Sequence, residues 1–101
     1  MAQAKHIRLF RATFRHHGED YPYRFQNGQE RTVRAVVRFG HQVIDSDNNV
    51  VADSADVVYL QKSEVPKPSQ GDRIIIDGDG YVLGQRLDQT GFYGAYLIQN
   101  D

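Results

Sequence analysis

The strongest constraint on the fold is a strict alternation of side-chain character that follows a tight-turn signal. Between residues 32 and 39 the apolar side chains recur at every second position: Val33, Ala35, Val37 and Phe39. Arg34 and Arg38 fall on the opposite face, and a period of two is typical of a half-buried strand. The preceding Asn27-Gly28 pair tolerates the positive φ angles of a type I′ turn, which predicts a β-hairpin.

Short stretches of the same kind occur through the rest of the chain. Expected strands are separated by Gly, Asp and Asn turn residues, and they cover residues 20–25, 32–39, 56–61, 73–77, 81–87 and 92–99. Pro66-Lys67-Pro68 interrupts this series and predicts an extended connector. Five to seven short antiparallel strands in about 80 residues predict a small antiparallel β-barrel or sandwich.

The N-terminal segment has a different periodicity. Ile7, Phe10 and Phe14 share one stripe of a helix, and Arg8, Arg11 and Arg15 lie in the neighbouring stripe. Gly18 stands where a left-handed residue would end this helix. At 101 residues the chain is long enough for one domain. We therefore expect a helical segment over residues 1–18 and a single β-barrel domain over residues 19–101.

Residues 40–54 lack a clear pattern. Short β-branched pairs flank a polar run from Asp45 to Asn49, and this arrangement fits either an outward hairpin or a long loop. We expect a flexible projecting arm, with a long mobile loop at residues 40–54. Its candidate partner-binding residues are Ile44, Asp45, Asp47, Asn48, Asn49, Val50 and Val51.

Charge is distributed unevenly along the chain. Residues 1–40 hold eight Lys and Arg against three acidic residues, whereas residues 41–101 hold four against ten. The opposite net charges of +5 and −6 suit a basic face for nucleic acid, or complementary faces that join identical copies head to tail. A solvated surface with accidental segregation of charge is the third interpretation.

No catalytic or metal-binding motif is present in the sequence. Cysteine is absent, which excludes disulfides and thiolate chemistry. Residues 45–56 resemble a calcium loop, but Val50 replaces the required glycine and Asp56 replaces the bidentate glutamate. The adjacent His16 and His17 would face different sides of a helix, so they do not suit one metal ion. We predict no enzyme, no cofactor and no metal site.

A small nucleic-acid-binding β-barrel is the alternative function. Arginine and aromatic residues interleave in residues 8–39, as in barrels that combine basic grooves with stacking aromatic rings. The expected strand over residues 32–39 weakens this alternative, because Phe39 falls on the opposite face from Arg34 and Arg38. Stacking and phosphate contacts would then use different surfaces.

Neither a membrane span nor a signal peptide is expected. No window holds 18 or more apolar residues, and the first twenty residues lack the unbroken apolar stretch of a signal peptide. We expect a chain that is made and kept inside the cell.

The order of these elements is similar to that of a known family. The features that carry the likeness are Thr32 to Val37, the polar arm, Val57 to Leu60, Ser63 to Pro66, Gly71 to Gly78, Tyr81 to Leu83, the turn at residues 88–91, and Ala95 to Ile98. In this order and spacing, the run from Gly28 to Ile98 resembles the lambda-type phage head-tail joining (head completion, neck) proteins and their prophage-encoded relatives.

The resemblance implies a structural virion protein without catalysis, which completes the phage head and joins it to the tail. It implies a ring, of six or twelve copies, between the portal or adaptor protein and the tail tube or tail terminator protein. The chain would reside in the virion neck, and in the host cytoplasm before assembly, without contacting a membrane. The segments that match residues 1–18 and 40–54 would become ordered on assembly and touch neighbours.

Two contacts follow as expectations. Arg8, Arg11 and Arg15 meet either an acidic partner surface or lumenal DNA, which they bind without sequence specificity. The arm at residues 40–54 contacts the portal side.

Overall fold

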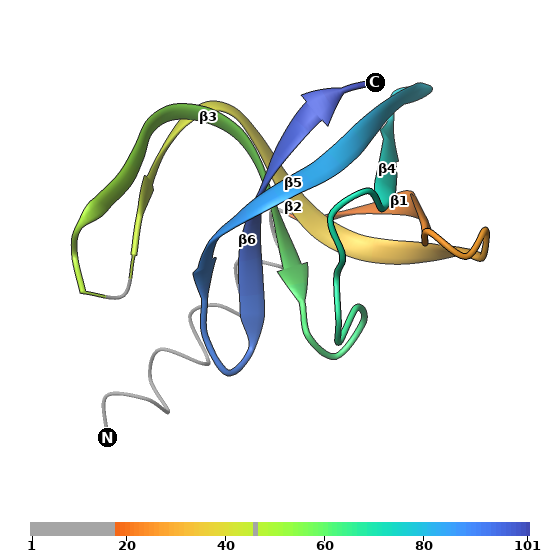
Figure 1. Cartoon of the computed structure of the whole chain (residues 1–101), viewed down its shortest axis with the longest axis horizontal. Helices are drawn as coiled ribbons and strands as arrows, with labels where there is room; N and C mark the ends of the chain where they lie inside the picture. Colours follow the sequence, from red (N-terminus) through yellow and green to blue (C-terminus); the bar gives the residue numbers. More distant parts are fainter. Residues whose placement is uncertain (1–17, 46) are drawn as a thin grey trace.

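The computed structural model describes residues 18–45 and 47–101, which form six β-strands. The strands are β1 (Glu19–Arg24), β2 (Glu30–Ile44), β3 (Val50–Gln61), β4 (Arg73–Ile76), β5 (Asp79–Gln89) and β6 (Tyr93–Asn100). Neighbouring strands pair antiparallel and close into a barrel in the order β1-β2-β3-β6-β5-β4 (Figure 1). The prediction of a small antiparallel barrel is confirmed. The helix expected within residues 1–18 lies outside the described residues, apart from its terminal Gly18.

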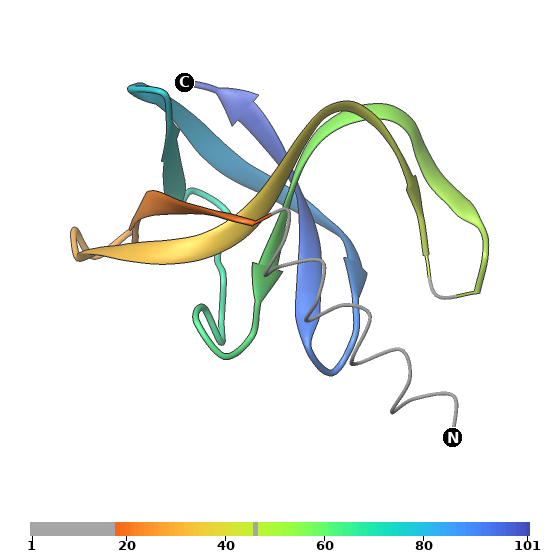
Figure 2. The same ribbon diagram turned by 180° about the vertical axis from the view of Figure 1, so that it is seen from behind.

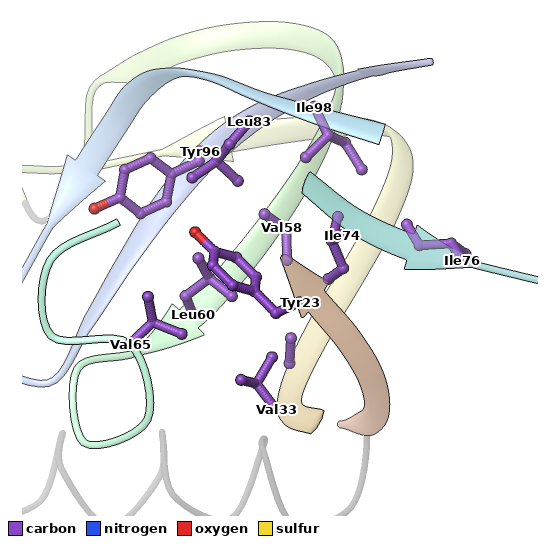
Figure 3. Close-up of a cluster of buried hydrophobic side chains, with 11 residues drawn as sticks. Tyr23, Val33, Val58, Leu60, Val65, Ile74, Ile76, Leu83, Tyr96 and Ile98 are labelled. Carbon is purple, nitrogen blue, oxygen red and sulfur yellow. The ribbon is translucent and has the colours of Figure 1, made fainter. Parts of the chain in front are cut away.

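The barrel interior is filled by side chains from all six strands and from the connector between β3 and β4 (Figure 3). Its buried members are Tyr23, Val33, Ala35, Val58, Leu60, Val65, Ile74, Ile76, Leu83, Tyr96 and Ile98. Val65 reaches this cluster from the proline-containing connector, so the connector packs against the core as well as linking two strands. This continuous core holds the closed sheet together through burial of apolar surface.

The two faces of β2 differ from the sequence expectation. Val33 and Ala35 are buried in the core as predicted, but Phe39 is 53% exposed and contacts the ring of Tyr81 at a centroid distance of 5.8 Å. Val36, on the expected arginine face, is buried in a second cluster with Tyr93. The barrel therefore carries a small apolar cluster on its outer side, which local alternation does not indicate.

The tight turns fall where turn residues stand, although their types differ from expectation. Gly28 has a φ of 92°, but Asn27 has no positive φ, so the predicted type I′ turn is wrong at this position. A type I′ turn occurs instead between β4 and β5, where Asp77 and Gly78 have φ angles of 52° and 85°. This two-residue turn joins the paired residues Ile76 and Asp79.

The loop predicted at residues 40–54 is a β-hairpin arm. β2 and β3 remain paired from Arg38↔Val57 to Ile44↔Val50, with register shifts along the way, and the arm curves away from the barrel (Figures 1 and 2). β2 ends at Ile44 and β3 begins at Val50, so strand structure covers most of residues 40–54. Of the two alternatives that the sequence left open, the structure has the outward hairpin, because β-branched pairs on both sides complete a backbone ladder.

Gly40 marks the point where the arm departs from the barrel. Gly40 lies within the register shift between Arg38 and His41 and has a φ of 59°. Its N–H donates to Asp56 Oδ1 over 3.0 Å. A residue in the left-handed region at a bulge bends the strand, and glycine adopts this conformation without steric cost. The sequence predicts that the strand ends at Gly40, whereas it bends there and continues.

Candidate partner-binding site on the hairpin arm

The tip of the arm is the turn that connects Ile44 of β2 to Val50 of β3. Asp45 N–H donates to the carbonyl oxygen of Asn49 over 2.9 Å, and Asn48 N–H donates to the carbonyl oxygen of Asp45 over 3.0 Å. Phe25 and Gln29 make the equivalent pair of bonds with Gly28 in the β1–β2 turn. The two turns therefore share one backbone design.

Side chains of the tip support this backbone. Asp45 Oδ1 accepts hydrogen bonds from the N–H groups of Asp47 and Asn49, both over 2.9 Å. Asn48 holds a left-handed φ of 66°, a conformation that asparagine adopts more readily than most residues. The polar run that the sequence presents as a loop signal thus builds a defined turn.

Exposed apolar side chains gather on the arm. Of the four large hydrophobic side chains that are exposed among the described residues, Ile44, Val50 and Val51 lie on the arm, whereas Phe39 precedes it and contacts Tyr81. Ile44 and Val50 are paired across the ladder at the tip, and each is about half exposed. Contiguous apolar surface on a soluble protein is typical of an interaction site. The arm is therefore the candidate partner-binding surface of the described chain.

The arm is acidic as well as apolar. Asp45, Asp47, Asp53 and Asp56 lie between residues 41 and 61, where the sequence has no Lys or Arg. Asp45 and Asp56 accept backbone hydrogen bonds, while the side chains of Asp47 and Asp53 are exposed to solvent. A partner for this surface needs apolar groups and positive charge.

Seven of the predicted binding residues converge at this tip: Ile44, Asp45, Asp47, Asn48, Asn49, Val50 and Val51. Arg8, Arg11 and Arg15 lie outside the described residues. Sequence reasoning missed Phe39, because its place in the alternation assigned it to the core. It also missed Asp53, whose acidic neighbours in the sequence are the signal that could have identified it.

Tyrosines on the barrel next to the arm are shielded from solvent. The Tyr59 and Tyr93 rings lie 5.9 Å apart, and Tyr93 Oη donates to Asp88 Oδ2 over 3.4 Å. Burial, followed by the Asp88 carboxylate, raises the pKa of Tyr93 to about 12. These hydroxyls stay protonated at neutral pH, so they act there as hydrogen-bond donors and packing groups.

Residues 18–45 and 47–101 contain no group of three or more His, Asp or Glu side chains able to hold a metal ion. Within those same ranges, no helix has the length and hydropathy required to cross a bilayer.

Among the described residues, the exposed large apolar side chains lie on the β2–β3 hairpin, and apolar surface of this kind is typical of a protein that binds other macromolecules. The family model described as "Phage Head-Tail Attachment protein" matches residues 3–97. The chain therefore belongs to the phage head-tail attachment protein family. No curated protein matches it at the level required for comparison.

Family membership confirms the resemblance found in the sequence. The protein has a structural, non-enzymatic role in joining the phage head to the tail. Its partners are accordingly components of the head and the tail, and its place is the head-tail junction of the virion.

Proposed function

We propose that this protein completes the head by assembling as a ring between the portal or adaptor protein and the tail tube or tail terminator protein. The observation that carries the proposal is the arm, which holds three of the four exposed large hydrophobic side chains of the described residues: Ile44, Val50 and Val51. A free subunit gains nothing from exposing this surface to water. An assembled subunit buries it, and that burial stabilises the complex.

Ring assembly accounts for both the acidic arm and the basic first part of the chain. Contacts between unlike surfaces of identical subunits close into rings when the rotation between neighbours allows it. The ring of six or twelve copies forms in the virion neck, from subunits that reside in the host cytoplasm beforehand. The faces of the ring then meet the portal side and the tail side.

Contact with lumenal DNA is part of the proposal for the N-terminal segment. Arg8, Arg11 and Arg15 provide positive charge that meets either an acidic partner surface or the DNA that passes through the ring, without sequence specificity. Replacing all three with glutamate should reduce the yield of joined particles. Full infectivity of that triple variant would remove this contact from the proposal.

The nucleic-acid-binding alternative is not favoured by the described barrel. Arg24, Arg34 and Arg73 each lie within 3.5 Å of a carboxylate oxygen, from Glu30, Asp20 and Asp101 respectively. Residues 18–101 also carry eight Lys and Arg against thirteen Asp and Glu, and this net charge of −5 opposes binding to a polyanion. A joining protein should accordingly bind free DNA weakly at physiological salt, with no steep salt dependence.

The proposal is tested by removing the apolar surface of the arm tip. Ile44, Val50 and Val51 are changed together to serine in the phage that encodes the chain, and particles are counted by negative-stain electron microscopy. We expect separate filled heads and complete tails, while the purified variant retains the far-ultraviolet circular dichroism of the barrel, because none of these side chains belongs to the core.

A matched control replaces exposed polar residues on β5 and β6, outside the arm. Asp79→Ser and Gln99→Ser change the polar surface of β5 and β6 without altering the arm. Joining should continue in this control. Normal joining by the arm variant as well would overturn the proposed role of the tip, and joined particles in the absence of the chain would overturn the ring itself.

A further inference from the structure

A groove opens at the seam where β1 meets β4 and closes the barrel. It has a volume of about 560 Å³ and is lined by Arg24, Phe25, Gln26, Gly28, Gly71 and Arg73. Arg24 and Arg73 are Cα partners across the seam, so their side chains lie on the same face of the sheet. The groove therefore presents two guanidinium groups together.

Both guanidinium groups are held by partners that a ligand can replace. Arg24 Nη2 lies 3.2 Å from Glu30 Oε2, and Arg73 Nε lies 2.8 Å from Asp101 Oδ2. The four side chains are between 43% and 49% exposed. Ion pairs this exposed contribute little to stability, so an incoming carboxylate can exchange with them at low cost.

The groove is also apolar on one side. Arg31 Cζ lies 5.4 Å from the centroid of the Phe25 ring, and the Phe25 ring packs edge-on against Tyr23 at 5.0 Å. A guanidinium stacked on an aromatic ring provides a flat surface with both apolar and cationic character. The groove therefore suits a ligand that combines apolar side chains with carboxylates.

The arm tip has this combination. Ile44, Val50 and Val51 supply exposed apolar groups, and Asp47 and Asp53 supply exposed carboxylates. In both views of the ribbon, the arm and the β1–β2 turn beside the groove lie at opposite ends of the molecule (Figures 1 and 2). An arm therefore does not reach the groove of its own subunit.

We propose that the arm tip of one subunit docks into the β1–β4 groove of a second copy. This inference rests on the ring of the proposed function and identifies the two surfaces that build it. It assigns the arm tip to the next copy in the ring, in place of the portal side that the sequence suggested. Complementary surfaces at opposite ends of one chain produce head-to-tail contacts, and a constant rotation between neighbours closes the ring.

Site-specific cross-linking tests the contact directly, because the natural chain contains no cysteine. Asn49→Cys marks the arm, Gln29→Cys marks the turn beside the groove, and Gln89→Cys marks the distant end of β5 as a control. All three side chains are exposed, so these changes leave the core and the seam intact. Differently tagged full-length single-cysteine chains are mixed at high concentration, and also co-assembled into particles, before a short thiol cross-linker is added.

We expect the Asn49→Cys and Gln29→Cys pair to cross-link at least about tenfold more efficiently than the Asn49→Cys and Gln89→Cys pair, since docking raises the local concentration of the two thiols. Equal yields for the two pairs in joined particles would overturn the arm-to-groove contact. That result would leave the ring of the proposed function standing, because joining is scored separately on the same particles.

Charge reversal provides a second, independent test of the contact. Arg24→Glu with Arg73→Glu, or Asp47→Lys with Asp53→Lys, should each lower the arm-to-groove cross-link yield by about tenfold, and combining all four changes should restore it. Failure of the combined variant to restore the yield, with an intact circular dichroism spectrum, would contradict the proposal.

Single-stranded DNA is the other candidate ligand of the groove, and its binding is measured with a short oligonucleotide. If the arginine reversal abolished DNA binding while leaving the cross-link yield unchanged, the groove would be a nucleic-acid site and the proposal would be wrong. We expect the arginine reversal to lower the cross-link yield, and we expect both the natural chain and this variant to bind DNA weakly.

Discussion

At the scale of single residues, Asp72 is the one buried charged side chain in the described part of the chain, at 2% exposure. Its Oδ2 accepts hydrogen bonds from Tyr23 Oη over 2.7 Å and from the Ser69 N–H over 3.0 Å, while its Oδ1 accepts from the Gln26 N–H over 3.0 Å. Three donors compensate for the desolvation of the carboxylate. They also tie β1 and the β1–β2 turn to the connector before β4.

Asp72→Ala should lower the free energy of unfolding by about 2 kcal/mol, because it leaves the buried Tyr23 hydroxyl and two partly buried N–H groups without their acceptor. Urea denaturation measures the change. Asp53→Ala, on the exposed part of β3, is the matched control and should stay within about 0.5 kcal/mol of the natural chain. A small effect at Asp72 would show that water replaces the carboxylate.

Tyrosine ionisation predicts the behaviour of the protein in alkali. Burial, with the hydrogen bond to Asp72, raises the pKa of Tyr23 above its ordinary value of 10.0, and the pKa of Tyr93 rises to about 12. Below pH 10 these groups are neutral in both folded and unfolded chains, so they add no pH dependence. Above pH 10 the unfolded chain loses protons that the folded chain retains, so stability falls as pH rises.

We therefore expect the absorbance of tyrosinate to rise in two stages, the later one coinciding with loss of circular dichroism. Tyr93→Phe should remove part of the pH dependence above 10, because phenylalanine has no proton to lose. Complete ionisation of all six tyrosines near pH 10 in a folded chain would contradict this prediction.

At the scale of elements, turn residues predicted the position of each hairpin better than its geometry. Asn27-Gly28 marked a real hairpin, but with one left-handed residue where two were expected, whereas Asp77-Gly78 forms the two-residue type I′ turn. Turns with one left-handed residue and type I′ turns with two accept the same residues. Which of them forms depends on the register and twist of the strands that the turn joins. That register is a property of the sheet.

Two glycines with open surroundings isolate the effect of backbone conformation. A Cβ at Gly28 or at Gly91 would meet no heavy atom within 4 Å, but Gly28 has a φ of 92° and Gly91 has no positive φ. Gly28→Ala should cost about 1 kcal/mol in stability, while Gly91→Ala should be neutral or slightly stabilising. Thermal denaturation of the two variants measures the difference, and equal effects would show that φ at Gly28 is not constrained.

The extension of the arm depends on the barrel to which it is attached. Its residues alternate weakly, and a two-stranded ribbon on its own is only marginally stable. Here the ladder continues outward from the barrel, where Val57 and Val58 are fully buried, so its inner end is anchored by the core. The sequence could place the polar tip, whereas the extension of the strands past Gly40 depends on this anchoring.

At the scale of the whole molecule, the closure of the barrel depends on a short seam. β1 and β4 share two paired positions, Tyr23↔Ile74 and Arg24↔Arg73. Gly71 lies next to this seam with a φ of 98°, and a Cβ there would collide with the side-chain amide of Gln26. The Gly71 N–H donates to the carbonyl oxygen of Leu83, which ties the connector to β5.

Gly71→Ala should therefore lower stability by about 1 kcal/mol and loosen the seam, because alanine is strained at this φ and the side-chain amide of Gln26 must shift. Amide hydrogen exchange of Gln26 and Leu83 should accelerate more than that of Val58. Gly80→Ala is the matched control, since a Cβ at Gly80 meets its nearest atoms at an ordinary 3.9 Å. Similar exchange in both variants would contradict the role of Gly71.

The sequence alone determined the class of fold, the positions of the turns and the residues of the arm tip, because period-two alternation and turn chemistry act over a few neighbouring residues. Its family likeness also identified the role in joining head to tail. Tertiary structure decided the closure of β1 on β4, the burial of Val36, the exposure of Phe39 and the groove between Arg24 and Arg73. Each of these features depends on contacts between residues far apart in the chain. Packing of the whole core sets those contacts, so no local sequence pattern indicates them.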